Sequence, residues 1–149
     1  MNYSIFKLSF NVKLPYIEDI YSSLSDLDKQ RVSSLDVLSS FYHDKLELRI
    51  IYMIISSKDM KNYKNLLNNN LIPYFCEDLS QLVLDNDIDL ELELQKWAEP
   101  ENYQDYDNFI YEVNQWLLKN LNLDSILDRI NQKGIKTLRP IDKDFLKTI

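Results

Sequence analysis

Glycine, cysteine, histidine and alanine are almost absent from this sequence, with one residue of each among 149. A single glycine argues against loops that wrap phosphates or dinucleotides through several positions without side chains. One histidine and one cysteine exclude most zinc sites and leave few combinations for a catalytic triad. The longest apolar run is six residues, at Ile50–Ile55, whereas a helix that spans a bilayer needs about 20.

The lone Cys76 cannot form an internal disulfide, so no oxidising compartment is implied. Residues 1–14 alternate between apolar and polar, which is not the pattern of a secretory signal. We therefore expect a cytoplasmic protein with no membrane attachment. Its length suits a single globular domain over residues 1–149, with a basic C-terminal segment at about 135–149.

Three segments have the pattern of β-strands. Residues 4–14 carry an apolar side chain at every second position, and Pro15 ends the pattern. Residues 46–56 are β-branched and apolar on both faces in their second half, as in a central strand that is covered on both sides. Residues 87–95 alternate acidic side chains with Ile and Leu, which predicts a third strand.

Four or five helices are expected from apolar residues at helical spacing. They fall at 16–42 (one bent helix or two, the second with Leu35, Leu38 and Phe41 on one face), 57–67, about 73–84, 105–120, and a short helix that opens at Asp124 and Ser125. Ser57 is a candidate N-cap, and Asn68–Asn70 are expected to turn the chain. Lys133 and Gly134 are expected to close the last helix.

These elements do not alternate regularly, and they predict an α+β fold. The sheet is expected to be small, mostly antiparallel or mixed, with about three strands packed against the helices. An all-α bundle is the alternative if the two apolar strands are helices instead.

The acidic residues are concentrated in one part of the chain. Residues 1–76 hold 9 basic and 8 acidic side chains, whereas residues 77–112 hold 12 acidic side chains and one basic one. Residues 113–149 hold 7 basic and 4 acidic side chains, which brings the formal net charge of the chain to −7. A block of this charge would attract and steer a basic partner.

Aromatic residues lie among these carboxylates, and Tyr is a frequent anchor at protein interfaces. The candidate partner-binding residues are Asp87, Asp89, Glu91, Glu93, Glu99, Glu101, Tyr103, Asp105, Tyr106, Asp107 and Tyr111. The leading hypothesis is a non-catalytic inhibitor that covers the basic surface of a nuclease-type toxin or nucleic-acid-processing enzyme, as an immunity protein or a phage or viral inhibitor does. Carboxylates that only solvate a strand or start a helix are the simpler explanation.

No catalytic, cofactor or metal site is predicted. Asp85, Asp87 and Asp89 have the spacing of the start of an EF-hand, but Leu90 and Lys96 occupy the positions that need Gly and Glu. His43 and Cys76 are distant in sequence and lack the context of a reactive pair.

Six basic residues between Arg129 and Lys147 are expected to form a solvated tail or to pair with the protein's own acidic block, so direct nucleic-acid binding is not expected. The alternative function is an adaptor or self-assembling structural protein that uses apolar and aromatic helix faces. Association of that kind would be insensitive to salt.

Overall fold

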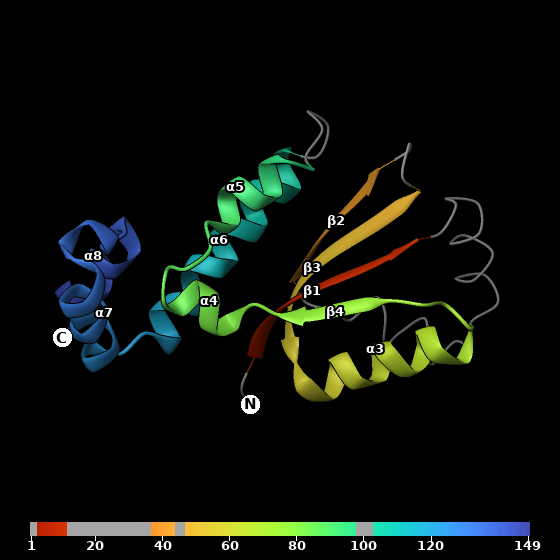
Figure 1. Cartoon of the computed structure of the whole chain (residues 1–149), viewed down its shortest axis with the longest axis horizontal. Helices are drawn as coiled ribbons and strands as arrows, with labels where there is room; N and C mark the ends of the chain where they lie inside the picture. The colour runs from red at the N-terminus through yellow and green to blue at the C-terminus, as the bar shows by residue number, and fades with distance from the viewer. Residues whose placement is uncertain (1–2, 12–36, 44–46, 98–102) are drawn as a thin grey trace. The chain divides into compact units, whose positions relative to one another are not determined.

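A computed structural model describes residues 3–11, 37–43, 47–97 and 103–149 of the chain (Figure 1). For residues 37–43 and 103–105 it describes the backbone alone. The elements in chain order are β1 (Tyr3–Asn11), β2 (Val37–His43), β3 (Leu48–Ser56), α3 (Ser57–Asn69), β4 (Phe75–Asp78), α4 (Ser80–Leu84), α5 (Leu90–Gln95), α6 (Tyr103–Asn120), α7 (Leu123–Lys133), the 3-10 turn η2 (Ile135–Thr137) and α8 (Pro140–Lys147). This is an α+β fold, as predicted.

The described chain divides into two compact units, residues 1–79 and residues 80–149. Unit 1 contains all the described strands together with α3, whereas unit 2 contains helices and the turn η2. None of the helices in the described ranges combines the length and the hydropathy needed to cross a bilayer.

The sheet of unit 1 has four strands in the order β2-β3-β1-β4, and every neighbouring pair is antiparallel. The predicted strands at 4–14 and 46–56 correspond to β1 and β3, with residues 12–14 and 46 outside the described part. β3 is a central strand, and all its residues from Ile50 to Ser56 are buried, which confirms the prediction of a strand covered on both faces.

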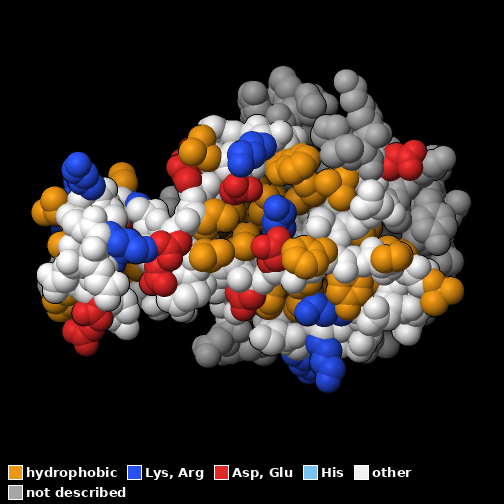
Figure 2. Space-filling view, viewed as in Figure 1, with side chains coloured by type: hydrophobic (Ala, Val, Ile, Leu, Met, Phe, Trp, Pro, Cys, Tyr) orange, Lys and Arg blue, Asp and Glu red, His pale blue; other side chains and the backbone are white. Residues whose placement is uncertain are grey.

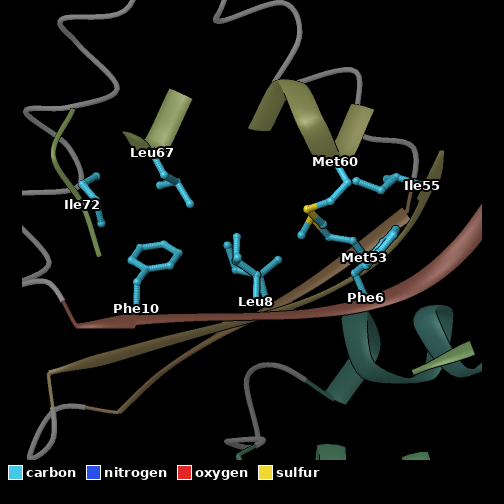
Figure 3. Close-up of a cluster of buried hydrophobic side chains, with 9 residues drawn as sticks. Phe6, Leu8, Phe10, Met53, Ile55, Met60, Leu67 and Ile72 are labelled. Carbon is cyan, nitrogen blue, oxygen red and sulfur yellow. The ribbon is translucent and has the colours of Figure 1, made fainter. Parts of the chain in front are cut away.

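One face of this sheet packs against α3 (Figure 3). The alternation in β1 directs Phe6, Leu8 and Phe10 to the same side, where they meet Met60 and Leu67 from α3. Burial of such side chains contributes about 1.5–3 kcal/mol each before entropy is counted. The apolar residues of the period-two pattern therefore form the side of this cluster that faces α3.

The ends of α3 lie close to the predicted positions, but different residues form the caps. Ser56 rather than Ser57 is the N-cap, and its hydroxyl accepts a hydrogen bond of 3.1 Å from the Asp59 amide. At the other end Leu71, not an asparagine, has the left-handed conformation, with φ of 57°. The Ile72 amide donates to the Leu67 carbonyl at 2.9 Å, as in a Schellman motif.

Two strands were not predicted. Residues 37–43 were expected to end a helix, but β2 pairs along its whole length with β3. Its β-branched and aromatic residues favour a strand once a partner strand is available, and tertiary pairing overrides the helical spacing. Residues 75–78, part of a predicted helix over 73–84, form β4 beside β1, and only 80–84 are helical. The remainder of the 16–42 prediction lies outside the described residues.

The third predicted strand is wrong. Residues 90–95 form the helix α5, with Leu90 and Leu94 buried one helical turn apart. Leu and Glu are good helix formers, and no β-branched residue occurs in this stretch, so local propensity favours the helix. The sequence alternates like a strand because Leu92 stands between Leu90 and Leu94, but in the helix Leu92 does not join their buried face and is 57% exposed.

The later helices follow the prediction closely. α6 covers the expected 105–120, and α7 follows after Asn122, whose side chain accepts from the Ser125 amide at 2.8 Å. Gly134 ends α7 with φ of 91°, a conformation that favours glycine. The basic C-terminal segment is not a tail in this structure, because residues 135–147 form η2 and α8.

Candidate binding surface

Unit 2 carries most of the surplus negative charge of the protein. It holds 14 acidic and 8 basic residues, a formal charge of −6, whereas unit 1 has a formal charge of −1. Figure 2 shows acidic side chains in red and basic ones in blue next to each other over α5, with hydrophobic side chains in orange between them. The candidate surface is therefore built from unit 2.

The link between α4 and α5 brings the first candidate carboxylates together. α4 ends in a Schellman motif, in which the Asp87 amide donates to the Leu82 carbonyl at 2.8 Å and Asn86 has a positive φ of 55°. The Asn86 amide group also donates to the Thr137 carbonyl at 3.0 Å. These bonds hold the link against η2 and fix the position of Asp87.

Several of these carboxylates have structural partners within unit 2. Asp87 forms an ion pair with Lys133, and Glu93 forms one with Lys96 at 3.0 Å. Asp89 is the N-cap of α5, where its side chain accepts from the Leu92 amide at 3.2 Å. Part of the acidic block therefore serves helix capping and internal pairing, as the simpler explanation holds.

Glu91 and Asp107 are different, because they are exposed and no ion pair joins them to a residue in the described part of the chain. Tyr111 lies one helical turn after Asp107 on α6 and is 61% exposed. The exposed Leu92 follows Glu91 on α5. Together these four residues, which we call the acidic face, combine exposed carboxylates with large exposed apolar groups.

Tyr106 was expected to be an interface anchor, but it is only 7% exposed and belongs to the core of unit 2. Its hydroxyl donates to the Glu91 carbonyl at 3.3 Å and accepts from the Gln95 amide group at 3.4 Å. Burial raises the pKa of this hydroxyl above its ordinary value, and the bond from Gln95 lowers it in part. Tyr106 positions α5 on α6 and is not available to a partner.

Four further candidates cannot be placed in full. Glu99 and Glu101 lie outside the described residues, and for Tyr103 and Asp105 only the helical backbone is described, in the first turn of α6. They remain candidates on the sequence alone.

A hollow of about 390 Å³ in unit 2 was not predicted from the sequence. It is enclosed by the α4–α5 link, one side of α6 and the start of α8. Its lining residues are Val83, Asn86, Ile88, Asp89, Leu90, Glu91, Ile110, Val113, Asn114, Leu117, Arg139, Pro140, Ile141 and Asp144. The sequence identified the apolar face of α6, but only the tertiary structure shows which part of that face is left open.

A buried ionic cluster lies beside this hollow. Asp142 is fully buried and accepts hydrogen bonds from the backbone and side chain of Arg139, at 2.8 and 3.0 Å. Arg129, also buried, contacts the same carboxylate at 2.6 Å and donates to the Leu84 carbonyl at 2.9 Å. The cluster ties α7 and α8 to the C-terminal carbonyls of α4.

The predictions about His43 and Cys76 concern unit 1. His43 is the last residue of β2. The Cys76 thiol lies 3.9 Å from the Met60 sulfur, and burial raises its pKa. Within the described ranges no three His, Cys, Asp or Glu side chains are grouped in a way that could hold a metal ion.

Comparison of the chain with models of protein families, with curated proteins and with solved structures finds no match.

Proposed function

We propose that this protein is a non-catalytic inhibitor that binds a basic macromolecular partner through the acidic face of unit 2 and blocks it stoichiometrically. The observation that carries the proposal is that α5 and α6 expose carboxylates, Glu91 and Asp107, together with the large apolar side chains of Leu92 and Tyr111. Carboxylates speed the approach of a basic protein, and apolar anchors supply affinity once water is excluded.

The partner that fits this surface is an enzyme with a surface rich in Lys and Arg. Nucleases and other nucleic-acid-processing enzymes carry such surfaces because they must bind phosphate groups. An acidic protein that covers the surface competes directly with the nucleic acid. The role would be that of an immunity protein against a nuclease-type toxin, or of a phage or viral inhibitor, acting in the cytoplasm.

The test is capture of partners from the native host on the immobilised full chain, at low and then high salt, with identification by mass spectrometry. The charge variant is Glu91→Gln with Asp107→Asn. The control is Asp59→Asn with Asp128→Asn, which removes the same charge from exposed positions on α3 and α7. Each variant is checked by thermal unfolding.

The proposal predicts a basic partner whose capture falls with salt, falls further in the charge variant and persists in the control variant. The purified partner should lose its activity on nucleic acid when one equivalent of the protein is added. Equal capture by the charge variant and the wild type would contradict the proposal, as would full activity of the partner in the complex.

A second candidate is self-assembly, as an adaptor or structural protein. It is favoured by Leu123 and Leu127, which lie one turn apart on α7 and are both more than 40% exposed. Light scattering over a concentration series would show salt-insensitive oligomers that Leu127→Lys dissolves. A monomer at every concentration would remove this candidate.

A further inference from the structure

The hollow in unit 2 is lined by both apolar and acidic side chains. Val83, Leu90, Val113 and Leu117 are buried in its walls, while Ile110 is partly exposed. Asp89, Glu91 and Asp144 are exposed lining residues from the α4–α5 link, α5 and α8. The lining therefore offers a ligand both apolar surface and carboxylates.

Among the described residues that line the hollow, Arg139 is the only cation, and it already has hydrogen-bond partners. The guanidinium of Arg139 donates to Asp142 through Nε and Nη2, at 3.0 and 3.1 Å, and to the carbonyls of Val83 and Leu84 through Nη1 and Nη2. An anion would find three carboxylates and no unused guanidinium there. A wholly apolar ligand would cover the carboxylates and leave them without water or a partner, which is costly.

We propose that the hollow receives an arginine side chain of the basic partner, with the alkyl stem against Ile110 and Ile141 and the guanidinium at Glu91 and Asp144. An arginine combines the apolar stem with a charged end that has five donors, so it suits a lining of apolar side chains and carboxylates. This inference rests on the proposed function, and it names the group that the site selects.

The test uses two blocked peptides, Ac-Ala-Leu-Arg-Leu-Ala-amide and the same peptide with citrulline in place of arginine. Citrulline is nearly isosteric with arginine and uncharged. Binding to the full chain, labelled at the isoleucine methyl groups, is followed by NMR. The arginine peptide should shift the signals of Ile88, Ile110 and Ile141, which line the hollow, and the citrulline peptide should bind about tenfold more weakly.

Three variants locate the site. Glu91→Gln with Asp144→Asn should weaken binding of the arginine peptide about tenfold. Asp59→Asn with Asp128→Asn removes the same charge from exposed positions outside the lining and should change binding by no more than about twofold. Asn114→Phe fills the hollow without changing the charge and should abolish the isoleucine shifts, with the fold checked by thermal unfolding.

The outcomes separate this inference from the proposed function. Equal weakening in the two charge variants, or equal binding of the citrulline peptide, would overturn the arginine site. Capture of the basic partner from the host, still sensitive to salt, would in that case leave the proposed function standing. The reverse outcome is also informative. If Asn114→Phe abolishes the isoleucine shifts but no basic partner is captured in a salt-sensitive way, the arginine site is supported and the proposed inhibitor function is contradicted.

Discussion

The two units of this chain differ in the side chains that they bury. Unit 1 has an apolar cluster between a sheet and α3, and its formal charge is close to zero. Unit 2 also has an apolar core, with Phe109, Trp116 and Ile126, but it buries Asp142 beside two arginines as well, and it carries a formal charge of −6. The comparison shows that the unit with the more polar interior also carries the surplus charge, the acidic face and the hollow.

The largest expected effect is at the ionic cluster. Asp142→Asn leaves Arg129 and Arg139 without a counter-charge in a buried site, and we expect a loss of about 3–5 kcal/mol in the free energy of unfolding. Urea unfolding followed by circular dichroism measures the loss. In hydrogen exchange, this loss of stability should appear as faster exchange in unit 2 first and in unit 1 only later.

The neighbouring Asp144→Asn is the matched control, because this side chain is exposed and should matter little to stability. If Asp142→Asn is no more destabilising than this control, the ionic cluster does not hold unit 2 together, and the contrast between the two units fails.

The stability of unit 1 should be sensitive to loss of side-chain volume instead of loss of charge. Leu8 is fully buried between the sheet and α3, and Leu8→Ala should cost about 3 kcal/mol through lost contacts and the cavity that remains. Hydrogen exchange should accelerate chiefly in β1, β3 and α3. A change below about 1 kcal/mol would mean that the cluster in Figure 3 is not the main core of unit 1.

The difference between unit 1 and unit 2 also explains which secondary structure could be predicted from the sequence. In unit 1, alternation in residues 4–14 and a β-branched run in 46–56 reflect real strands, because their apolar faces are buried. In unit 2, the same alternation at 87–95 was misleading, because a helical cap at Asp89 and burial of Leu90 and Leu94 decide the structure. Short elements depend on tertiary contacts, which a period-two pattern does not report.

The candidate site was predicted in part. The sequence correctly located surplus charge, but it could not separate Glu91 and Asp107 from carboxylates that cap a helix or pair with a lysine. It also presented Tyr106 as exposed, because a tyrosine at the start of a helix gives no local sign of burial. The hollow joins residues far apart in sequence, so no local pattern could reveal it.

A smaller effect tests the correction at α5. Asp89→Ala removes the N-cap and should lower the free energy of unfolding by about 1 kcal/mol. Asp89→Asn keeps a capping oxygen and should lower it by only about a few tenths of 1 kcal/mol. Thermal unfolding of both variants gives the comparison. Equal stability of the two variants would argue against the cap and in favour of another structure for residues 90–95.

The smallest effect is expected in unit 1, at the end of α3. Leu71 is exposed with φ of 57°, a conformation that is strained for leucine and natural for glycine. Leu71→Gly should therefore stabilise the protein by about 0.5–1 kcal/mol, whereas Leu71→Ala should not. A loss of stability in the glycine variant, measured by urea unfolding, would mean that the turn is not strained.

A hydrogen-exchange footprint of the full chain with the basic partner captured from the host tests most directly whether unit 2 binds that partner. Binding through the acidic face should slow exchange in residues 85–96 and 106–115, which contain this face and much of the hollow, and should leave exchange unchanged in β1, β3 and α3. Slower exchange confined to unit 1, with unit 2 unaffected, would contradict the claim that the charged unit binds the partner.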